Sequence, residues 1–453
     1  MMTCTNTSTT DVSTTGVTTG VSSVAAAAAL VDFRDGFYRA WDGWADTAFE
    51  LCEALLCAPG PVASMPGLSL DPVFRRSHGS LYKCLREGWL DSEAMRDLQV
   101  RHLPAEAPLV FAVDESVWPR AAAQTSPERG FYYTASRHTG GHPVVAGWSY
   151  QWIAALSWAR DSWTTPMDVA RVPPGADPVE VTASQLRDLT GRLRKQGHTQ
   201  TPVFVFDAGY DAIALTHELA NLDACLVVRV RDDRVVYTEP AEPTGIAGRP
   251  RRHGERRACA EPDTWPAPDI ELHDHDDRYG TVHVTAWHHL HPQLYCRGRW
   301  ADLDRPPIVT GTMVRVEVEH PPRPWSQAAK PLWLWVGGPT SPDIDLCWRG
   351  YLHRFDIEHT FRFFKHGLGW TTPRICTPDQ ADRWTWLIIA AYTQLCLARD
   401  LTTDQRLPWE TRHTPAHHLS PTGVCPSRRI VALNGRFLPG GKGHYGKVSH
   451  IHC

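Results

Sequence analysis

The sequence predicts an α/β fold, with an N-terminal helical domain before the core and a β-rich insertion late in it. Two short apolar runs, at residues 109–113 and 202–206, are each followed directly by an aspartate. An amphipathic helical pattern at residues 182–196 separates them, and strand patterns broken by proline and glycine occupy residues 236–340. Helical patterns with capping signals return after residue 341. This order indicates a sheet that is interrupted late in the chain.

The composition is that of a globular protein without a membrane-spanning segment. Of 453 residues, 42% are hydrophobic and 21% are charged, which is enough for two or three substructures. The apolar stretches are too short to span a bilayer, and the N-terminal region lacks the basic segment of a secretory signal. We therefore expect a soluble, cytoplasmic protein with no membrane partner. The 12 cysteines include no Cys-x-x-Cys pair, which argues against a zinc ribbon and favours buried thiols.

Net charge is a weak guide to nucleic-acid binding here. The formal charge of -4 argues against a uniformly basic binder, but binding depends on local patches. One basic patch comprises Arg229, Arg231 and Arg234. For a second cluster, solvated loops are an equally good explanation. Its members are Arg249, Arg251, Arg252, Arg256 and Arg257.

Residues 1–25 form a low-complexity tail, which we expect to be disordered because it offers little apolar surface to offset the entropy of ordering. Helical periodicity follows, and Pro59-Gly60-Pro61 ends the first helical segment. The apolar residues that recur at helical spacing are Phe33, Phe37, Trp41, Trp44, Leu51 and Leu55. Further helical patterning up to about Leu98 predicts an N-terminal helical domain over residues 26–105.

The first part of the core is assigned to residues 106–235. Its predicted strands are Leu109–Val113, Val144–Trp158, Pro202–Phe206 and Cys225–Val230, with a helix at Thr182–Gln196. The β-rich insertion is assigned to residues 236–340. Its predicted strands are Thr281–Trp287, Ile308–Glu319 and Pro331–Val336.

Two helices are predicted in residues 341–420, the last part of the core. The first has Ser341 as its N-cap, Pro342 at its first position and Gly367 near its end. The second opens with the capping-box pattern of residues 377–380 and runs through Trp384 to Leu395. Residues 421–453 show neither periodicity nor caps and are assigned to an irregular tail.

Asp114 and Asp207 stand directly after the two apolar strands, where side chains emerge at a sheet edge. This position suits a ligand, although a turn-forming aspartate is an equal alternative for either residue alone. Glu115 competes locally with Asp114. Alternation along an extended strand places these two acids on opposite faces, so they cannot serve together.

A polar stripe is predicted on the helix that follows the insertion. At roughly 100° per residue, and with Tyr351 set at ~0°, Arg354 falls near ~300° and Glu358 near ~340°. Arg362 falls near ~20° and Lys365 near ~320°, so the stripe is about 80° wide. Solvated ion pairs between residues four apart are the alternative explanation of this face. The apolar flank, which should pack on a sheet, comprises Ile357, Phe361 and Phe364.

Tyr351, Arg354, Glu358 and Lys365 fit the pattern Tyr-x2-Arg-x3-Glu-x6-Lys at every spacing. In this pattern the chain resembles a large group of bacterial insertion-sequence transposases of the DDE type, which have a retroviral-integrase-like, RNase H-like catalytic core. The wider context resembles one actinobacterial-type branch of that group, over roughly residues 30–420. The segments that carry this second resemblance are residues 112–114, 206–211, 229–234, 248–250 and 354–361.

The resemblance implies that Asp114, Asp207 and Glu358 are the catalytic carboxylates and the metal ligands. Their separations along the chain also fit the group, whose members place a β-rich insertion before the last glutamate. It implies two Mg²⁺ ions, for which Mn²⁺ can substitute, about 3.5–4 Å apart on either side of the scissile phosphate. Three carboxylates without a His or Cys ligand suit Mg²⁺, which prefers oxygen donors.

The resemblance further implies double-stranded DNA as the partner, both as transposon terminal inverted repeats and as target DNA, bound by a homodimer. Arg354 and Lys365 would contact phosphates next to the cut, Tyr351 would donate a hydrogen bond to one, and Arg362 belongs to the same DNA-binding set. The N-terminal helical domain would recognise transposon ends. We expect a bacterial protein associated with the nucleoid.

The sequence departs from that group after about Pro421, where another helix and a basic tail are expected. Two rival functions stay open. One is a stand-alone or domesticated nuclease of the same fold, which cleaves without joining. The other is a catalytically inactive DNA-binding protein, against which the three intact carboxylates argue.

Overall fold

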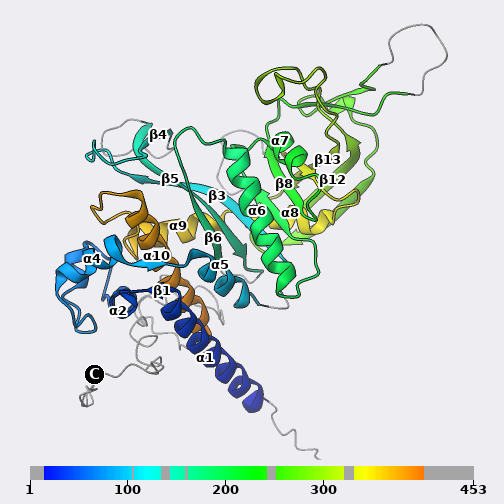
Figure 1. Cartoon of the computed structure of the whole chain (residues 1–453). Helices are drawn as coiled ribbons and strands as arrows, with labels where there is room; N and C mark the ends of the chain where they lie inside the picture. The colour runs from blue at the N-terminus through cyan, green and yellow to red at the C-terminus, as the bar shows by residue number, and fades with distance from the viewer. Residues whose placement is uncertain are drawn as a thin grey trace, which may run out of the picture. The chain divides into compact units, whose positions relative to one another are not determined.

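A ten-stranded mixed sheet lies in residues 96–385, the larger of two units into which the chain divides (Figure 1). The computed structural model describes residues 15–104, 107–133, 143–158, 162–241, 251–320 and 331–401. The strands of the sheet are β3 (Val110–Pro119), β4 (Gly130–Tyr133), β5 (Val144–Leu156), β6 (Thr164–Val172), β7 (Val203–Phe206), β8 (Cys225–Val230), β11 (Ile270–Asp276), β12 (Gly280–Leu290), β13 (Gly311–Val318) and β14 (Leu332–Gly337). The mixed α/β architecture predicted from the sequence is confirmed.

The order of the strands puts the short, wholly apolar strand β7 in the interior of the sheet. The path is β11-β12-β13-β14-β8-β7-β3-β5-β4, and β6 pairs with β5. Strand β7 pairs in parallel with both β3 and β8, whereas the other ladders of this sheet are antiparallel. All residues of β7 are buried, as expected for a strand that is covered on both faces.

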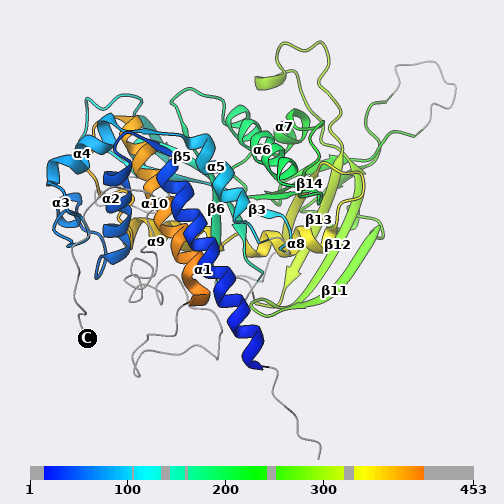
Figure 2. The same ribbon diagram turned by 60° about the horizontal axis from the view of Figure 1, so that its bottom comes forward.

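Helices cover both faces of the sheet (Figure 2). On one face, Phe111 and Val113 of β3 share a core with residues of α6 (Pro178–Lys195) and α7 (Ala212–Glu218). On the other face lie α8 (Ile344–His353) and α9 (Asp356–His366). There Gly350 of α8 comes so close to Val110 of β3 that an added Cβ would lie 2.7 Å from its Cγ1. Because strand side chains alternate, even-numbered positions of β3 face α8 and α9.

The stretch 236–340 does not leave the sheet but extends it. Strand β14 pairs with β8, and β13, β12 and β11 follow outward as antiparallel neighbours. The predicted strands of this stretch are present as β12, β13 and β14. The sequence missed β11, because polar side chains occupy most of it and leave little apolar alternation. A separate two-stranded ladder joins β9 (Val235–Tyr237) to β10 (Arg256–Ala258), and short turns of helix lie at η1 (Pro262–Thr264) and η2 (Gly298–Trp300).

The smaller unit comprises residues 1–95 and 386–453, of which 15–95 and 386–401 are described. Its elements are α1 (Thr15–Arg39), β1 (Trp41–Asp42), α2 (Ala45–Cys57), α3 (Met65–Leu68), α4 (His78–Glu87), β2 (Trp89–Leu90) and η3 (Arg399–Leu401). Two helices cross the unit boundaries, namely α5 (Ser92–Arg101) and α10 (Pro378–Ala398). Within the unit, the buried Arg34 guanidinium donates to Glu53 at 2.7 Å and to Gln394 at 2.6 Å.

Two expectations for the N-terminal region are wrong. Helix α1 begins at Thr15, so residues 15–25 are helical rather than disordered, and the alanine run that follows explains this through its high helix propensity. Residues 1–14 lie outside the described part. The helical spacing from Phe33 to Leu55 is also interrupted, because Gly43 and Trp44 adopt positive φ angles of 62° and 61° and turn the chain between α1 and α2.

The single helix expected between Pro342 and Gly367 is in fact two helices. Asp343 rather than Ser341 caps α8, since its carboxylate accepts from the Leu346 amide at 3.0 Å. A short turn at Arg354 and Phe355 separates α8 from α9. The second predicted helix is confirmed as α10. The assigned tail at 421–453 lies outside the described residues, and no described helix is both long and apolar enough to cross a membrane.

Candidate active site

The register of the parallel strands places Asp114 and Asp207 side by side. Val113 pairs with Phe206 as the last parallel partners of β3 and β7, and the two aspartates are the next residues along. Asp114 is not at the end of its strand as expected, because β3 continues to Pro119 while paired with β5 alone. The aspartates therefore lie where two neighbouring strands part, on the face that α8 and α9 cover.

Arg354 lies between the two aspartates. Its Nη1 is 3.3 Å from Asp114 Oδ2 and its Nη2 is 3.7 Å from Asp207 Oδ1, and the side chain is only 2% exposed. The turn after α8 puts it there, because the Arg354 amide donates to the Tyr351 carbonyl at 3.2 Å in a tightened last turn. Arg354 is thus a buried cation that holds two carboxylates, and a solvated face is excluded for it.

Helix α9 contributes Glu358 to the same group of charges. Burial raises the pKa of Asp114 to about 6, Arg354 opposes this rise, and the negative charges of Asp207 and Glu358 add to it. Asp207 and Glu358 are therefore both close enough to act electrostatically on Asp114. The expected apolar flank of α9 is confirmed, because Phe361 and Phe364 pack against Trp152 of β5 with ring centroids 5.7 and 5.3 Å apart.

Lys365 also faces the carboxylates, from a position seven residues after Glu358 on α9. Burial lowers the pKa of its ammonium group, and attraction to Asp114 opposes that shift. Its Nζ is 5.8 Å from the centroid of the Trp370 ring. Arg362, by contrast, is exposed. Within the predicted polar stripe, Tyr351 and Arg354 are thus buried, Glu358 and Lys365 are half-buried, and Arg362 is exposed.

Tyr351 and Arg229 close the Asp207 side of the site. Tyr351 is 6% exposed, and burial raises the pKa of its phenol while Arg354 and a hydrogen bond with Arg229 lower it. Arg229 Nη1 lies 3.9 Å from Asp207 Oδ1. The sequence placed Arg229 in a basic patch but not at the site. Its position on β8 next to β7 is the signal that could have located it.

Tyr210 is a further residue that the sequence did not single out as part of the site. Its hydroxyl is buried and has no hydrogen-bond partner among the described residues. Burial raises the pKa of this phenol well above its usual range, and the negative charge of Asp114 raises it further. Tyr210 follows Asp207 in a turn, where its amide donates to the Asp207 carbonyl at 3.3 Å.

The residues present fit a divalent cation. Asp207 Oδ1 accepts no hydrogen bond among the described residues, although the Arg354 and Arg229 guanidinium groups lie 3.7 and 3.9 Å from it. This oxygen is therefore free to coordinate an ion. All three acids offer oxygen donors, the type that Mg²⁺ prefers. Arg354 already supplies one positive charge between Asp114 and Asp207, so the guanidinium stabilises the paired aspartates before any ion binds.

The start of α9 is fixed to the β11–β12 turn. Arg278 Nη1 donates to both carboxylate oxygens of Asp356, at 2.8 and 3.0 Å, and Asp356 is 2% exposed. His353 lies 3.7 Å from Asp356 on one side and 3.7 Å from Asp276 on the other. The Tyr279 hydroxyl donates to the Leu352 carbonyl at 3.0 Å. These contacts hold the joint between α8 and α9. Asp356 lies two residues after Arg354 and two residues before Glu358.

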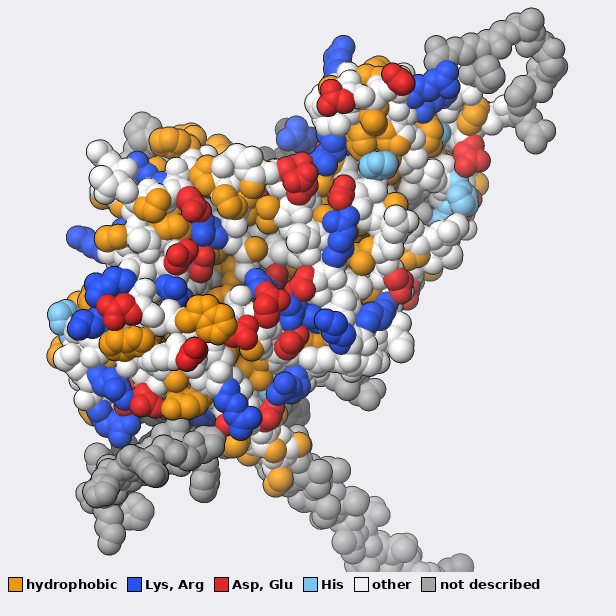
Figure 3. Space-filling view, viewed as in Figure 1, with side chains coloured by type: hydrophobic (Ala, Val, Ile, Leu, Met, Phe, Trp, Pro, Cys, Tyr) orange, Lys and Arg blue, Asp and Glu red, His pale blue; other side chains and the backbone are white. Residues whose placement is uncertain are grey.

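The second arginine cluster is engaged within the chain. Arg256 donates to Glu261 at 2.7 and 2.9 Å, Arg257 pairs with Glu255, and Arg252 donates to the Pro306 carbonyl at 2.7 Å. Arg249 lies outside the described residues. On the face seen in Figure 3, acidic and basic side chains are interspersed. These observations favour a structural explanation of this cluster.

A comparison with protein families agrees with this geometry. Residues 32–293, more than half of the chain, match the family model described as DDE superfamily endonuclease. The matched stretch includes Asp114 and Asp207 and ends before Glu358. No curated protein matches the chain.

Proposed function

The chain belongs to the DDE superfamily of endonucleases, and from this premise we propose that it is a DNA transposase. It would cut double-stranded DNA at transposon terminal inverted repeats and join the ends to target DNA. The observation that carries the proposal is the grouping of Asp114, Asp207 and Glu358 around the buried guanidinium of Arg354.

Asp114, Asp207 and Glu358 would hold the catalytic cations. Two bound Mg²⁺ ions, or Mn²⁺ in their place, would activate the attacking hydroxyl and stabilise the leaving oxygen. In support of this proposal, the parallel register of β3 and β7 positions Asp114 and Asp207, and the packing of α9 on Trp152 positions the helix that carries Glu358. A rigid arrangement of this kind is what positioning of a scissile phosphate requires.

The basic residues would contact different phosphates of the substrate. Lys365, half-buried near Asp114, is suited to a phosphate next to the cut, and the exposed Arg362 is suited to one further along the strand. Tyr351 would donate a hydrogen bond. Arg354 would act mainly as a positioning residue for the aspartates, because its guanidinium is buried against them.

Other parts of the proposal rest on the family resemblance. The core would be RNase H-like, the N-terminal helices would recognise transposon ends, and the protein would act as a homodimer on DNA in the bacterial nucleoid. A stand-alone nuclease of the same fold is the second candidate, because the same carboxylates serve cleavage alone. Joining activity distinguishes the two.

The decisive experiment compares Glu358→Gln with the parent protein on labelled end DNA. The amide keeps the size of the side chain but is a weaker ligand for a divalent ion. We expect loss of Mg²⁺-dependent nicking and joining, with DNA binding and the circular-dichroism spectrum retained. Near-parental cleavage by this variant would remove Glu358 from the metal ligands and refute the central proposal.

Glu115→Gln is the matched control. Glu115 is the neighbour of Asp114 in the chain but faces the other side of the sheet, where Ser149 donates to it at 3.2 Å. This substitution should leave nicking intact. A parent that nicks but never joins, with inverted repeats supplied, would assign the chain to the nuclease alternative.

A further inference from the structure

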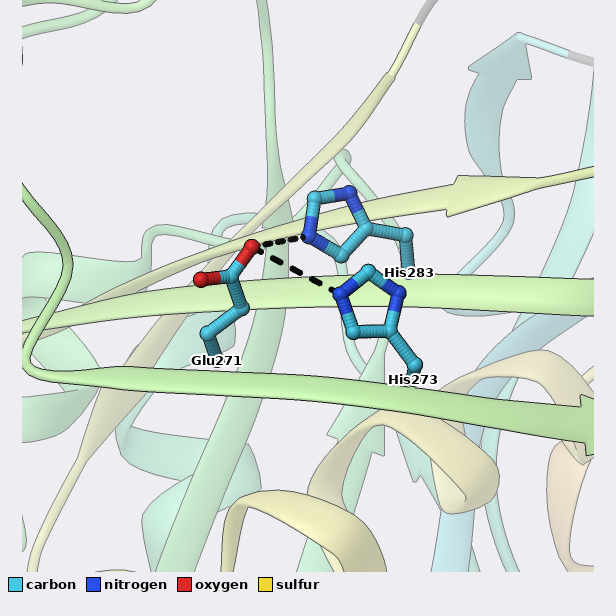
Figure 4. Close-up of side chains that lie close together, drawn as sticks. All are labelled: Glu271, His273 and His283. Carbon is cyan, nitrogen blue, oxygen red and sulfur yellow. Dashed lines mark hydrogen bonds and ion pairs between the residues drawn. The ribbon is translucent and has the colours of Figure 1, made fainter.

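A group of metal-ligating side chains lies away from the carboxylates, on the solvent-facing side of the β11–β12 hairpin. It consists of Glu271 and His273 on β11 and His283 on β12 (Figure 4). His273 and His283 are direct partners in the antiparallel register, and Glu271 lies two residues before His273 on the same face. The pleat therefore presents all three side chains together.

The donor atoms are already spaced as a small cation needs them. His283 Nε2 is 2.9 Å and His273 Nε2 is 3.7 Å from Glu271 Oε1, and all three ligand atoms lie within 4.8 Å of one another. A tetrahedral ion about 2.1 Å from each donor would hold them about 3.4 Å apart. The two imidazole rings are stacked, with centroids 4.4 Å apart and planes at 2°. Modest ring rotations would turn both nitrogens toward one ion.

A second carboxylate orients one of the histidines from behind. His283 Nδ1 lies 3.4 Å from Glu317 Oε2 on β13, while the other ring nitrogen faces Glu271. Glu317 is itself held, because Arg315 donates to its Oε1 at 2.7 Å. Histidine ligands of metals commonly place their second ring nitrogen against a carboxylate in this way, which fixes the ring and its tautomer.

We propose that Glu271, His273 and His283 bind a first-row transition-metal ion of the Zn²⁺ class. Two imidazoles and one carboxylate suit Zn²⁺, whereas the hard ion Mg²⁺ prefers oxygen ligands alone. Water completes the coordination, because the site is open to solvent. The ion ties the edge strand β11 to β12 at the outer end of the sheet. This site is separate from the proposed catalytic carboxylates and does not depend on the proposed function.

Titration of the full chain with Zn²⁺, in the presence of excess Mg²⁺, tests the site by calorimetry. An Asp114→Asn, Asp207→Asn, Glu358→Gln background removes the three proposed catalytic carboxylates from the measurement. Co²⁺ in place of Zn²⁺ reports coordination through its visible absorption. We expect one bound ion per chain, and loss of at least a hundredfold in affinity in His273→Ala and in His283→Ala.

Two further variants keep the result interpretable. His275→Ala removes an exposed histidine from the same face of β11 that lies outside the donor group, and it should bind Zn²⁺ as the parent does. Glu317→Ala should weaken binding by roughly ten- to a hundredfold, as loss of an orienting partner does. No binding to the parent, or equal binding by His283→Ala and the parent, overturns the proposal. Circular dichroism of each variant separates loss of a ligand from loss of fold.

Discussion

Replacement of Gly350 by alanine tests how the sheet positions Arg354. Gly350 lies in α8 one turn before Arg354, and an added Cβ would be 2.7 Å from Val110 Cγ1 and 3.4 Å from Val205 Cγ1. Val110 is fully buried and β-branched, so it has no free rotamer into which it can move. Helix α8 must then shift by roughly 0.7 Å to restore ordinary contact with the sheet.

The expected cost combines two opposing effects. Overpacking of a well-packed core costs about 1–3 kcal/mol, while a glycine-to-alanine change inside a helix contributes about 1 kcal/mol of stability. Gly191→Ala in α6 isolates the second effect, because a Cβ there meets nothing within 4 Å. We expect Gly191→Ala to raise the free energy of unfolding by about 0.5–1 kcal/mol. Gly350→Ala should be about 1–3 kcal/mol less stable than Gly191→Ala.

Urea titrations followed by tryptophan fluorescence measure both variants against the parent. Nicking of end DNA provides the functional readout, since a shift of α8 moves Arg354 relative to Asp114 and Asp207. Misplacement of this size can cost up to about a hundredfold in rate, and Gly191→Ala should leave the rate unchanged. Equal stability of the two variants would refute the close packing of α8 on β3.

Three other substitutions probe separate charges of the site. Arg354→Met removes the cation between Asp114 and Asp207, so the variant should lose about 3–5 kcal/mol of stability in EDTA. It should gain more stability than the parent from Mg²⁺ in thermal melts, and an equal gain would argue against a shared cation site. Arg362→Ala should leave stability unchanged and reduce the salt slope of DNA binding by about 0.9, the value of one phosphate contact; an unchanged slope assigns Arg362 no phosphate. Arg278→Ala strips Asp356 of its bidentate partner and should cost about 3–5 kcal/mol, with faster hydrogen exchange at the start of α9; unchanged exchange would show that this pair does not hold the joint.

Much of the core could be predicted from the sequence, because its strands are short apolar runs that are easily recognised as strands. Strands β7 and β8 match their predicted bounds closely, and both aspartates were selected from their places after such runs. The family resemblance predicted that Asp114 and Asp207 lie together, but the register that brings them together was not readable, because register between distant strands depends on packing of the whole sheet. The same limit hid Arg229, which reaches Asp207 from the neighbouring strand.

Helical angles misplaced Arg354 for a local reason. The predicted angles apply to one regular helix, whereas a turn at residues 354 and 355 tightens the backbone to hydrogen bonds between residues three apart. The sheet beneath the turn buries the Arg354 side chain, and helical periodicity alone cannot predict that burial. The sequence did not predict the metal-ligating group, because it did not predict strand β11. The alternating residues Glu271, His273 and His275 are polar and give no hydrophobic signal for a strand.

The extended part of the sheet contacts the start of α9 directly. Strands β11 to β14 continue the sheet from β8, so this region is part of the core sheet. Arg278 in its β11–β12 turn donates to Asp356, the first residue of α9. Asp356 has to stay paired because it is almost fully buried. The position of Glu358, two residues later, therefore depends on that turn. An ion bound by Glu271, His273 and His283 would stiffen the same hairpin from its open face, so its occupancy should lower hydrogen exchange in β11 first and at the start of α9 second.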